Sequence, residues 1–228
     1  HNRMERNCWY NLAASLLNNK RYEEASVTLD TMLTLWPKDP EQMSMKAQVC
    51  LCLEDTALAE TWTDRALVID EYNGVALSLK ASMLLHRDSN RLAEQAFEKA
   101  LVQRPRDAGL HTGRAIARYN QNNLRGAMED YDMAIELDSL SYTSHYNRGL
   151  LRAQVGEDNK AVEDFNYVLT LDSSDVIARY NRALLLQNIG DYLGAIRDLS
   201  AVIAEYPQFW TGYQQRAAIK RLIGDIAG

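Results

Sequence analysis

The sequence predicts an all-α fold, a solenoid of antiparallel helix pairs with six full repeats plus a terminal helix. Three observations predict it. The 228 residues include only 11 Gly and 4 Pro, about half the usual share, so most connections should be short. An alanine column recurs every 34 residues. Apolar residues follow those alanines at helical spacing.

Two columns of small residues set the repeat length. The first column consists of Ala25, Ala59, Ala93, Ala127, Ala161 and Ala195. The second column consists of Ala13, Ala47, Ala81, Ala115, Gly149, Ala183 and Ala217. Small residues suit places where paired helices cross, because a large side chain would hold the axes apart. A period of this length indicates stacked helix pairs, each of which buries its apolar face only against its neighbours.

The columns divide the chain into six full repeats and a partial seventh. The predicted repeats are 6–39, 40–73, 74–107, 108–141, 142–175, 176–209 and 210–228. We expect them to form a single solenoid domain over residues 1–228. Because the sequence begins with His1 and shows no signal peptide, we expect it to be part of a longer chain. Positions are counted within each repeat, so that Arg6 occupies position 1.

The first helix of each repeat has start and stop signals. Position 34 of the preceding repeat carries good N-caps: Asp39, Asn73, Asp107, Ser141 and Asp175. Pro40 and Gln42 add a capping-box pattern after Asp39. Position 15 is expected to end the helix in a left-handed conformation. It holds Lys20, Glu54, Asp88 and Asn122, and then Gly156, Gly190 and Gly224.

The second helix carries an apolar stripe at positions 20, 24 and 27, which lie on one face. Position 24 holds Leu29, Thr63, Phe97, Tyr131, Phe165 and Leu199. Position 27 holds Met32, Ala66, Ala100, Ala134, Val168 and Val202. Prolines at position 32 are expected to end the helix; they are Pro37, Pro105 and Pro207. Thr63 and Glu71 depart from the pattern, so we expect looser packing in the second repeat.

This pattern resembles the tetratricopeptide repeat over residues 6–224, and the resemblance implies a right-handed superhelical solenoid. The resemblance is carried by Trp9-x-x-Leu12-Ala13-x-x-Leu16, Tyr22-x-x-Ala25 and Gly190-Asp191-Tyr192-x-x-Ala195. The later repeats, beginning with Asn123-Leu124-Arg125-Gly126-Ala127, also resemble long arrays in exported bacterial proteins of the Bacteroidales. That second resemblance implies a periplasmic or cell-envelope location.

Composition limits the classes of partner. A net charge of −6 argues against nucleic acid. The longest uncharged stretch, Asn7–Asn19, has 13 residues, too few to insert into a membrane. Cys8, Cys50 and Cys52 are interpreted as small apolar packing residues, which favours a reducing compartment such as the cytoplasm. The location therefore stays open.

Position 7 is basic in every repeat after the first. It holds Lys46, Lys80, Arg114, Arg148, Arg182 and Arg216. These residues could form a cationic ladder for an acidic ligand, but three of them have an aspartate 16 residues later. The predicted ion pairs are Arg114 with Asp130, Arg148 with Asp164 and Arg182 with Asp198. Position 11 holds Arg118, Arg152 and Lys220, which either pair with the same carboxylates or face solvent.

No chemistry-bearing motif stands out. His111 and His145 share position 4, but two ligands do not make a metal site, so we interpret them as packing residues. The sequence contains no Gly-x-Ser-x-Gly, His-Glu-x-x-His, Gly-x-Gly-x-x-Gly or Walker pattern. We therefore expect no catalytic, metal or cofactor site, and no enzymatic activity within these residues.

The resemblance implies that the first helices line a concave groove. We predict a groove patch for an extended peptide, formed by Tyr146, Asn147, Tyr180, Asn181, Gln187 and Gln214. Tyrosine offers contact area, and the amides can bind a peptide backbone. The alternative is that the Tyr-Asn pairs are only repeat consensus. A carboxylate clamp, as in some family members, is not expected, because its lysine positions hold Tyr146 and Thr211.

The predicted function is a non-catalytic protein–protein interaction scaffold or adaptor that holds a partner peptide in the groove. The partner is a protein or peptide of unknown identity. One alternative is a structural spacer, or a self-associating array within a larger envelope protein, with contacts through the terminal helices. Another places catalysis in parts of the protein outside this sequence.

Overall fold

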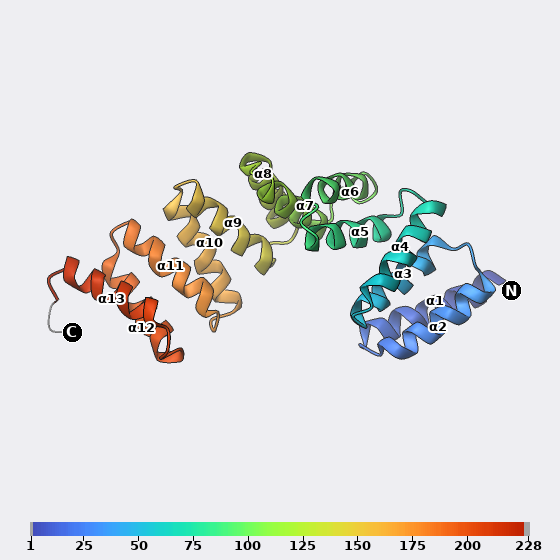
Figure 1. The fold of residues 1–228 in the computed structure, drawn as a ribbon, viewed down its shortest axis with the longest axis horizontal. Coiled ribbons are helices and arrows are strands. Elements are labelled where there is room, and N and C mark those ends of the chain that lie inside the picture. Colours follow the sequence, from blue (N-terminus) through green and yellow to red (C-terminus); the bar gives the residue numbers. More distant parts are fainter. Residues whose placement is uncertain (1, 226–228) are drawn as a thin grey trace. The chain divides into compact units, whose positions relative to one another are not determined.

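The structure, a computed structural model, describes residues 2–225, with side chains from residue 4 onward. His1 and residues 226–228, the end of the predicted repeat 210–228, lie outside it. The described residues form thirteen α-helices and no strand (Figure 1). The helices are α1 (Asn2–Asn18), α2 (Tyr22–Leu35), α3 (Pro40–Cys52), α4 (Thr56–Ile69), α5 (Gly74–His86), α6 (Asn90–Gln103), α7 (Ala108–Asn120), α8 (Leu124–Leu137), α9 (Tyr142–Gln154), α10 (Asp158–Leu171), α11 (Val176–Asn188), α12 (Tyr192–Glu205) and α13 (Trp210–Leu222). The predicted fold of six helix pairs and a terminal helix is confirmed.

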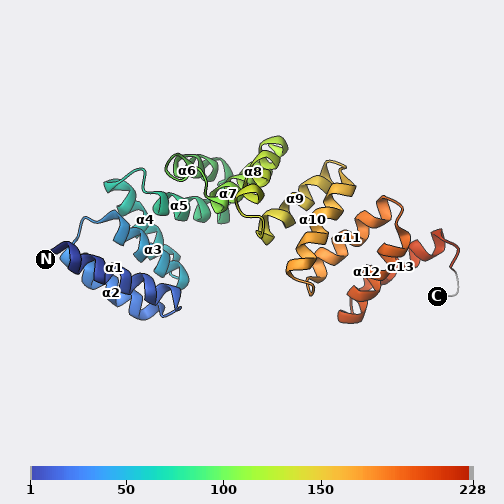
Figure 2. The same cartoon turned by 180° about the vertical axis from the view of Figure 1, so that it is seen from behind.

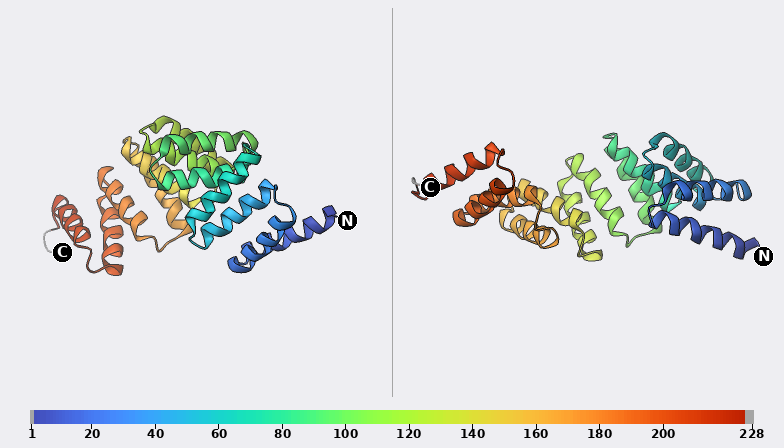
Figure 3. Two further views of the ribbon diagram at one scale, coloured as in Figure 1. Left: turned by 45° about the vertical axis from the view of Figure 1, so that its right-hand side comes forward. Right: turned by 90° about the horizontal axis from the view of Figure 1, so that it is seen from below.

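The helices fall into two compact units, unit 1 over residues 1–122 and unit 2 over residues 123–228. In unit 1, each helix from α1 to α6 packs against the helix that follows it, and the first helices α1, α3, α5 and α7 also contact one another in succession. In unit 2, α8 to α13 each pack against the next helix (Figure 2). Figure 3 shows the helix pairs of each unit from two further directions. The single domain predicted over 1–228 stays a prediction.

The predicted N-caps all accept backbone hydrogen bonds at the starts of first helices. The caps and the N–H donors are Asp39 with Glu41 and Gln42, Asn73 with Ala76, Asp107 with Leu110, Ser141 with Ser144, and Asp175 with Ile177 and Ala178. Pro40 is the first residue of α3, as predicted. In a capping box the Gln42 side chain would accept a hydrogen bond from the Asp39 backbone N–H. Here Gln42 Nε2 instead donates to the Asp39 carboxylate at 2.9 Å.

Every position-15 residue has a positive φ, as the predicted helix stop requires. The φ angles are 59° at Lys20, 62° at Glu54, 54° at Asp88, 62° at Asn122, 79° at Gly156, 85° at Gly190 and 79° at Gly224. The second helices end two residues before position 32 whether or not proline is there. α4 ends at Ile69, before Glu71, just as α2 ends at Leu35, before Pro37. Proline is therefore compatible with this stop but is not needed for it.

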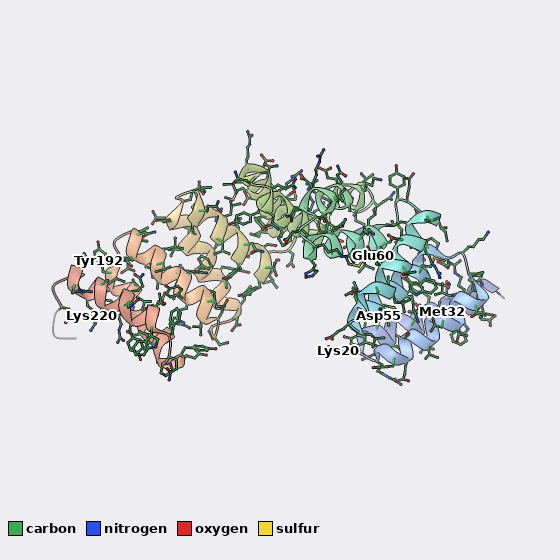
Figure 4. All side chains as sticks on the ribbon, in the orientation of Figure 1. Lys20, Met32, Asp55, Glu60, Tyr192 and Lys220 are labelled. Atoms are coloured by element: carbon green, nitrogen blue, oxygen red, sulfur yellow. The ribbon has the colours of Figure 1, made fainter. Side chains whose placement is uncertain are left out.

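Lys20→Gly should raise the free energy of unfolding by about 0.5–1 kcal/mol. A side chain at a left-handed residue costs more than the extra chain entropy of glycine. Lys20 lies at the turn between α1 and α2 (Figure 4). The matched control is Lys99→Gly within α6, which should lower stability by about 1 kcal/mol. Urea unfolding measures both variants, and a loss of stability in Lys20→Gly would contradict the assignment.

The alanine column is buried, which supports its predicted place at the helix crossings. All six residues of the first column are fully buried. At Gly149 in the second column, an added Cβ would lie 3.2 Å from Asp164 Cβ and from the Phe165 ring. Ala217 is exposed on α13, the last helix described. The second repeat buries Thr63 completely, with its hydroxyl donating to the Ala59 carbonyl at 2.8 Å; its looser packing stays a prediction.

Candidate functional site

Two of the three predicted ion pairs lie within unit 2 and are confirmed. Arg148 Nη2 lies 2.6 Å from Asp164 Oδ1, and Arg182 Nη2 lies 2.7 Å from Asp198 Oδ1. Both carboxylates are buried. The third pair, Arg114 with Asp130, would join the two units and stays a prediction.

The position-7 side chains have a second partner that sequence reasoning missed, at position 25 of the preceding repeat. The contacts measure 2.6–3.1 Å and join Lys46 to Asp30, Lys80 to Asp64, Arg148 to Asp132, Arg182 to Asn166 and Arg216 to Ser200. The signal was present, because position 25 is polar in all six full repeats: Asp30, Asp64, Glu98, Asp132, Asn166 and Ser200. The position-7 residue therefore bridges one repeat to the repeat before it.

At position 11, Arg152 follows the predicted alternative of pairing with the same carboxylate as position 7, whereas Arg118 binds a carboxylate that was not predicted. Arg152 Nη1 lies 2.8 Å from Asp164 Oδ2, so Asp164 receives two guanidinium groups. Arg118 Nε instead lies 2.8 Å from Glu94 Oε1 on α6. These cations are neutralised by carboxylates of the chain, which supports the structural interpretation over a cationic ladder for an acidic ligand.

Unit 1 contains a similar cluster around Glu60, which is labelled in Figure 4. Arg87 binds its carboxylate through two nitrogens, at 2.7 and 2.9 Å, and Lys80 Nζ lies 3.2 Å away. Hydrogen bonds from Arg87 and then Lys80 lower the pKa of Glu60 to about 2. Because that pKa lies below the unfolded value, Glu60 stabilises the fold at neutral pH and loses this contribution as the pH falls from about 4.5 to about 2.

Glu60→Gln should therefore weaken the acid dependence of the melting temperature. The wild-type chain should lose more stability between neutral pH and about pH 2 than the variant does. Thermal melts across this range measure the difference. Glu71→Gln, which removes an exposed carboxylate of the same unit, is the control and should follow the wild type. Identical pH profiles for Glu60→Gln and the wild type would contradict the prediction.

The position-4 histidines bind the loop that precedes their helix. His111 Nε2 lies 2.9 Å from the Pro105 carbonyl oxygen, and His145 Nε2 lies 3.1 Å from that of Ser139. This repeated contact supports a packing role. In the described part of the chain, no group of three or more His, Cys, Asp or Glu side chains is placed to hold a metal ion. Nor is any helix described here long and apolar enough to cross a membrane.

The predicted groove patch lies on α9, α11 and α13 of unit 2. The structure joins two of its residues directly, since Asn181 Nδ2 donates to the Tyr146 hydroxyl at 3.3 Å. Tyr180 is the neighbour of Asn181 along α11. No described hydrogen bond connects Asn147, Gln187 or Gln214 to the other patch residues. Asn147 and Gln187 are half-buried, and Gln214 is exposed on α13.

Aromatic rings surround the direct contact. Tyr146 stacks on Tyr142 with ring centroids 5.8 Å apart, and Tyr180 meets Phe209 edge-on at 5.1 Å. The Tyr142 hydroxyl donates to the Asp175 carboxylate. Burial, followed by the nearby Asp175 charge, raises the pKa of Tyr146. The Tyr146 hydroxyl therefore stays protonated at neutral pH and can serve as a hydrogen-bond donor.

Tyr180 and Asn181 also border an open cavity of about 810 Å³ that sequence reasoning missed. Its apolar wall includes Val176, Ile177, Tyr180, Val202, Tyr206, Pro207 and Phe209. The sequence held a signal for this cavity in Tyr206-Pro207-Gln208-Phe209-Trp210, where three aromatic residues fall within five positions at the connection between α12 and α13. A cavity of this size lies within the range of about 300–1,000 Å³ that is usual for ligand sites.

Two family models described as "Tetratricopeptide repeat" match the chain. One matches residues 79–142 and 112–176, and the other matches 178–208. Together they cover more than half of the sequence. No curated protein matches the chain in a sequence comparison.

Solved structures share the fold. PilF of Pseudomonas aeruginosa has a TM-score of 0.83 and 18% identity over 96% of this chain and 99% of its own. YrrB, described as "a TPR protein with an unusual peptide-binding site", has a TM-score of 0.70 and 18% identity over 82% and 97%. MamA from Desulfovibrio magneticus RS-1 has a TM-score of 0.62 and 23% identity over 75% and 96%. At these identities the similarity shows the fold alone, and the resemblance to Bacteroidales arrays stays a prediction.

Proposed function

The chain belongs to the tetratricopeptide repeat family, and we propose that it is a non-catalytic scaffold that binds a peptide segment of a partner protein on unit 2. The observation that carries the proposal is the contact between Asn181 of α11 and Tyr146 of α9 beside an open cavity. It supports a continuous surface across neighbouring first helices. The peptide-binding site described for YrrB supports the idea that this fold can present such a surface.

The groove patch suits an extended chain. Neighbouring helices in a stack lie roughly 8–10 Å apart, and side chains on one face of an extended peptide recur every ~6.5–7 Å. Tyr146 and Tyr180 provide contact area, while Asn147 and Asn181 can donate to and accept from peptide groups. Because the patch itself carries no charge, binding should depend only weakly on salt.

Asn147→Ala combined with Asn181→Ala should weaken peptide binding by about 1–3 kcal/mol through the loss of two hydrogen-bonding side chains. The melting temperature should stay nearly unchanged, since both side chains are only half-buried. The probe is a peptide selected from a random display library on the intact chain, and its affinity is measured by calorimetry. Asn159→Ala, an exposed position on α10, is the control.

The opposite pattern would assign the two asparagines to packing. If the double variant melts well below the wild type and still binds the peptide, the patch loses its named site. The spacer interpretation would then be preferred.

The spacer or self-association alternative has one observation in its favour. The terminal helix α13 leaves Trp210 75% exposed and Leu222 64% exposed, and exposed apolar surface favours association. Sedimentation over a dilution series tests it. A concentration-dependent dimer that Trp210→Ser abolishes would support self-association, whereas a monomer at all concentrations would contradict it.

A further inference from the structure

We propose that the cavity beside α11 binds an apolar side chain of a partner peptide together with an adjacent lysine or arginine. This inference rests on the proposed function and specifies which peptides the surface would select. The cavity lies wholly within unit 2, between the first turns of α11 and the connection from α12 to α13. It shares Tyr180 and Asn181 with the groove patch.

The apolar wall is left exposed in a way that suits an anchor side chain. Two residues of the lining are largely exposed: Ile177 on α11 at 65% and Tyr206 in the connection after α12 at 55%. Burial of such surface is favourable in proportion to its area. Interfaces concentrate their binding energy in large side chains that enter pockets of this kind.

Phe209 supports a binding role because it breaks a local rule at the cavity. The same repeat position holds an Asp, Asn or Ser N-cap before each of the five preceding first helices. At Phe209, α13 starts without a side-chain cap. The ring instead packs edge-on against Tyr180 and forms part of the cavity wall. A sequence that gives up a helix cap at such a place indicates selection for a site.

The acidic residues around the cavity favour a basic residue in the peptide, next to the anchor side chain. Glu205 lies in the lining, and no described cation pairs with it. Asp172 and Asp175 lie in the turn before α11 and are also acidic. The basic residues of α11 are engaged elsewhere, since Arg179 donates to the Ser173 carbonyl and Arg182 pairs with Asp198. A positive side chain beside the anchor would therefore find an unpaired carboxylate.

A peptide fits better than a small apolar molecule, because the rim can bind a main chain. Asn181 and Gln208 place side-chain amides in the cavity lining. Each amide can both donate to and accept from a peptide group. A bound peptide could then extend from the cavity along the groove patch.

The test uses peptides selected from a random display library on the intact chain. Enriched sequences should share an aromatic or branched aliphatic residue with Lys or Arg one or two places away. Ile177→Ser should weaken such a peptide about tenfold, and Glu205→Lys should weaken it about two- to fivefold. Glu205→Lys should also prefer a peptide whose basic residue is changed to Glu. The controls are Leu193→Ser, at 64% exposure on α12, and Glu163→Lys on α10; both should bind like the wild type.

Three results would overturn the proposal, and they separate it from the proposed function. If Asn147→Ala with Asn181→Ala weakens binding but Ile177→Ser and Glu205→Lys do not, the peptide does not occupy the cavity. The proposed scaffold function would then still hold. If none of these variants changes binding, both fail. If Ile177→Ser leaves peptide affinity unchanged but abolishes a dimer seen by light scattering, the occupant is a second copy of this chain.

Discussion

Asp164→Ala is expected to lower the free energy of unfolding by about 3–5 kcal/mol, the usual cost of removing one partner from a buried ion pair. The Asp164 side chain is only 2% exposed. Its carboxylate receives Arg148 at 2.6 Å and Arg152 at 2.8 Å. The variant would leave two partly buried guanidinium groups without their shared partner. Urea unfolding monitored by circular dichroism measures the loss.

Two comparisons isolate the cause. Replacing Asp164, Arg148 and Arg152 together with Leu, Met and Met should cost less than Asp164→Ala, because the only carboxylate that loses its partner is the exposed one of Asp132. Lys160→Ala removes an exposed pair with Glu157 and should cost about 0–1 kcal/mol. A triple variant less stable than Asp164→Ala would show that the charges themselves stabilise the fold.

Ala161→Leu is expected to cost about 1–3 kcal/mol through overpacking. Ala161 has no exposed surface and packs with Phe165, Val168 and Leu185. The larger side chain would push apart helices that cross at this residue. The control is Ala204→Leu, at an exposed position of α12. Its free energy of unfolding, measured by urea unfolding, should stay within about 0.5 kcal/mol of the wild type. Equal stabilities for the two variants would mean that the alanine column does not mark a crossing.

The fold could be predicted because its determinants are local and recur. An N-cap, a left-handed stop and a small residue in the alanine column each depend on the residue at one fixed place. The stop and the alanine recur in all six full repeats, and the N-cap recurs in five. Lys20 and Glu54 adopt the left-handed conformation without glycine, which shows that the repeat geometry outweighs the preference of a single residue.

The ion pairs were predicted only in part. The pair Arg148–Asp164 joins two helices of one repeat, and a spacing of 16 residues in three repeats made it visible. The partner in the preceding repeat, Asp132, lies 16 residues earlier. Position 25, which Asp132 occupies, changes to Asn and Ser in the last two full repeats. A search for a repeated acidic residue therefore does not identify this partner position.

The cavity could not be predicted from columns, because it arises from residues that depart from them. Phe209 occupies an N-cap position, and Tyr206 lies in a connection. Their contribution depends on how the connection folds back toward Tyr180, which a repeat pattern does not specify. Repeat consensus therefore describes the scaffold well and its individual surface poorly.

The most direct test of peptide binding on unit 2 is a side-chain amide NMR titration of the intact chain with a selected peptide. The proposed function predicts that the signals of Asn147, Asn181 and Gln187 shift with the bound fraction, while that of Asn159 on α10 stays in place. Shifts at Asn159 without shifts at Asn147 and Asn181 would contradict it, because the peptide would then lie away from the groove patch.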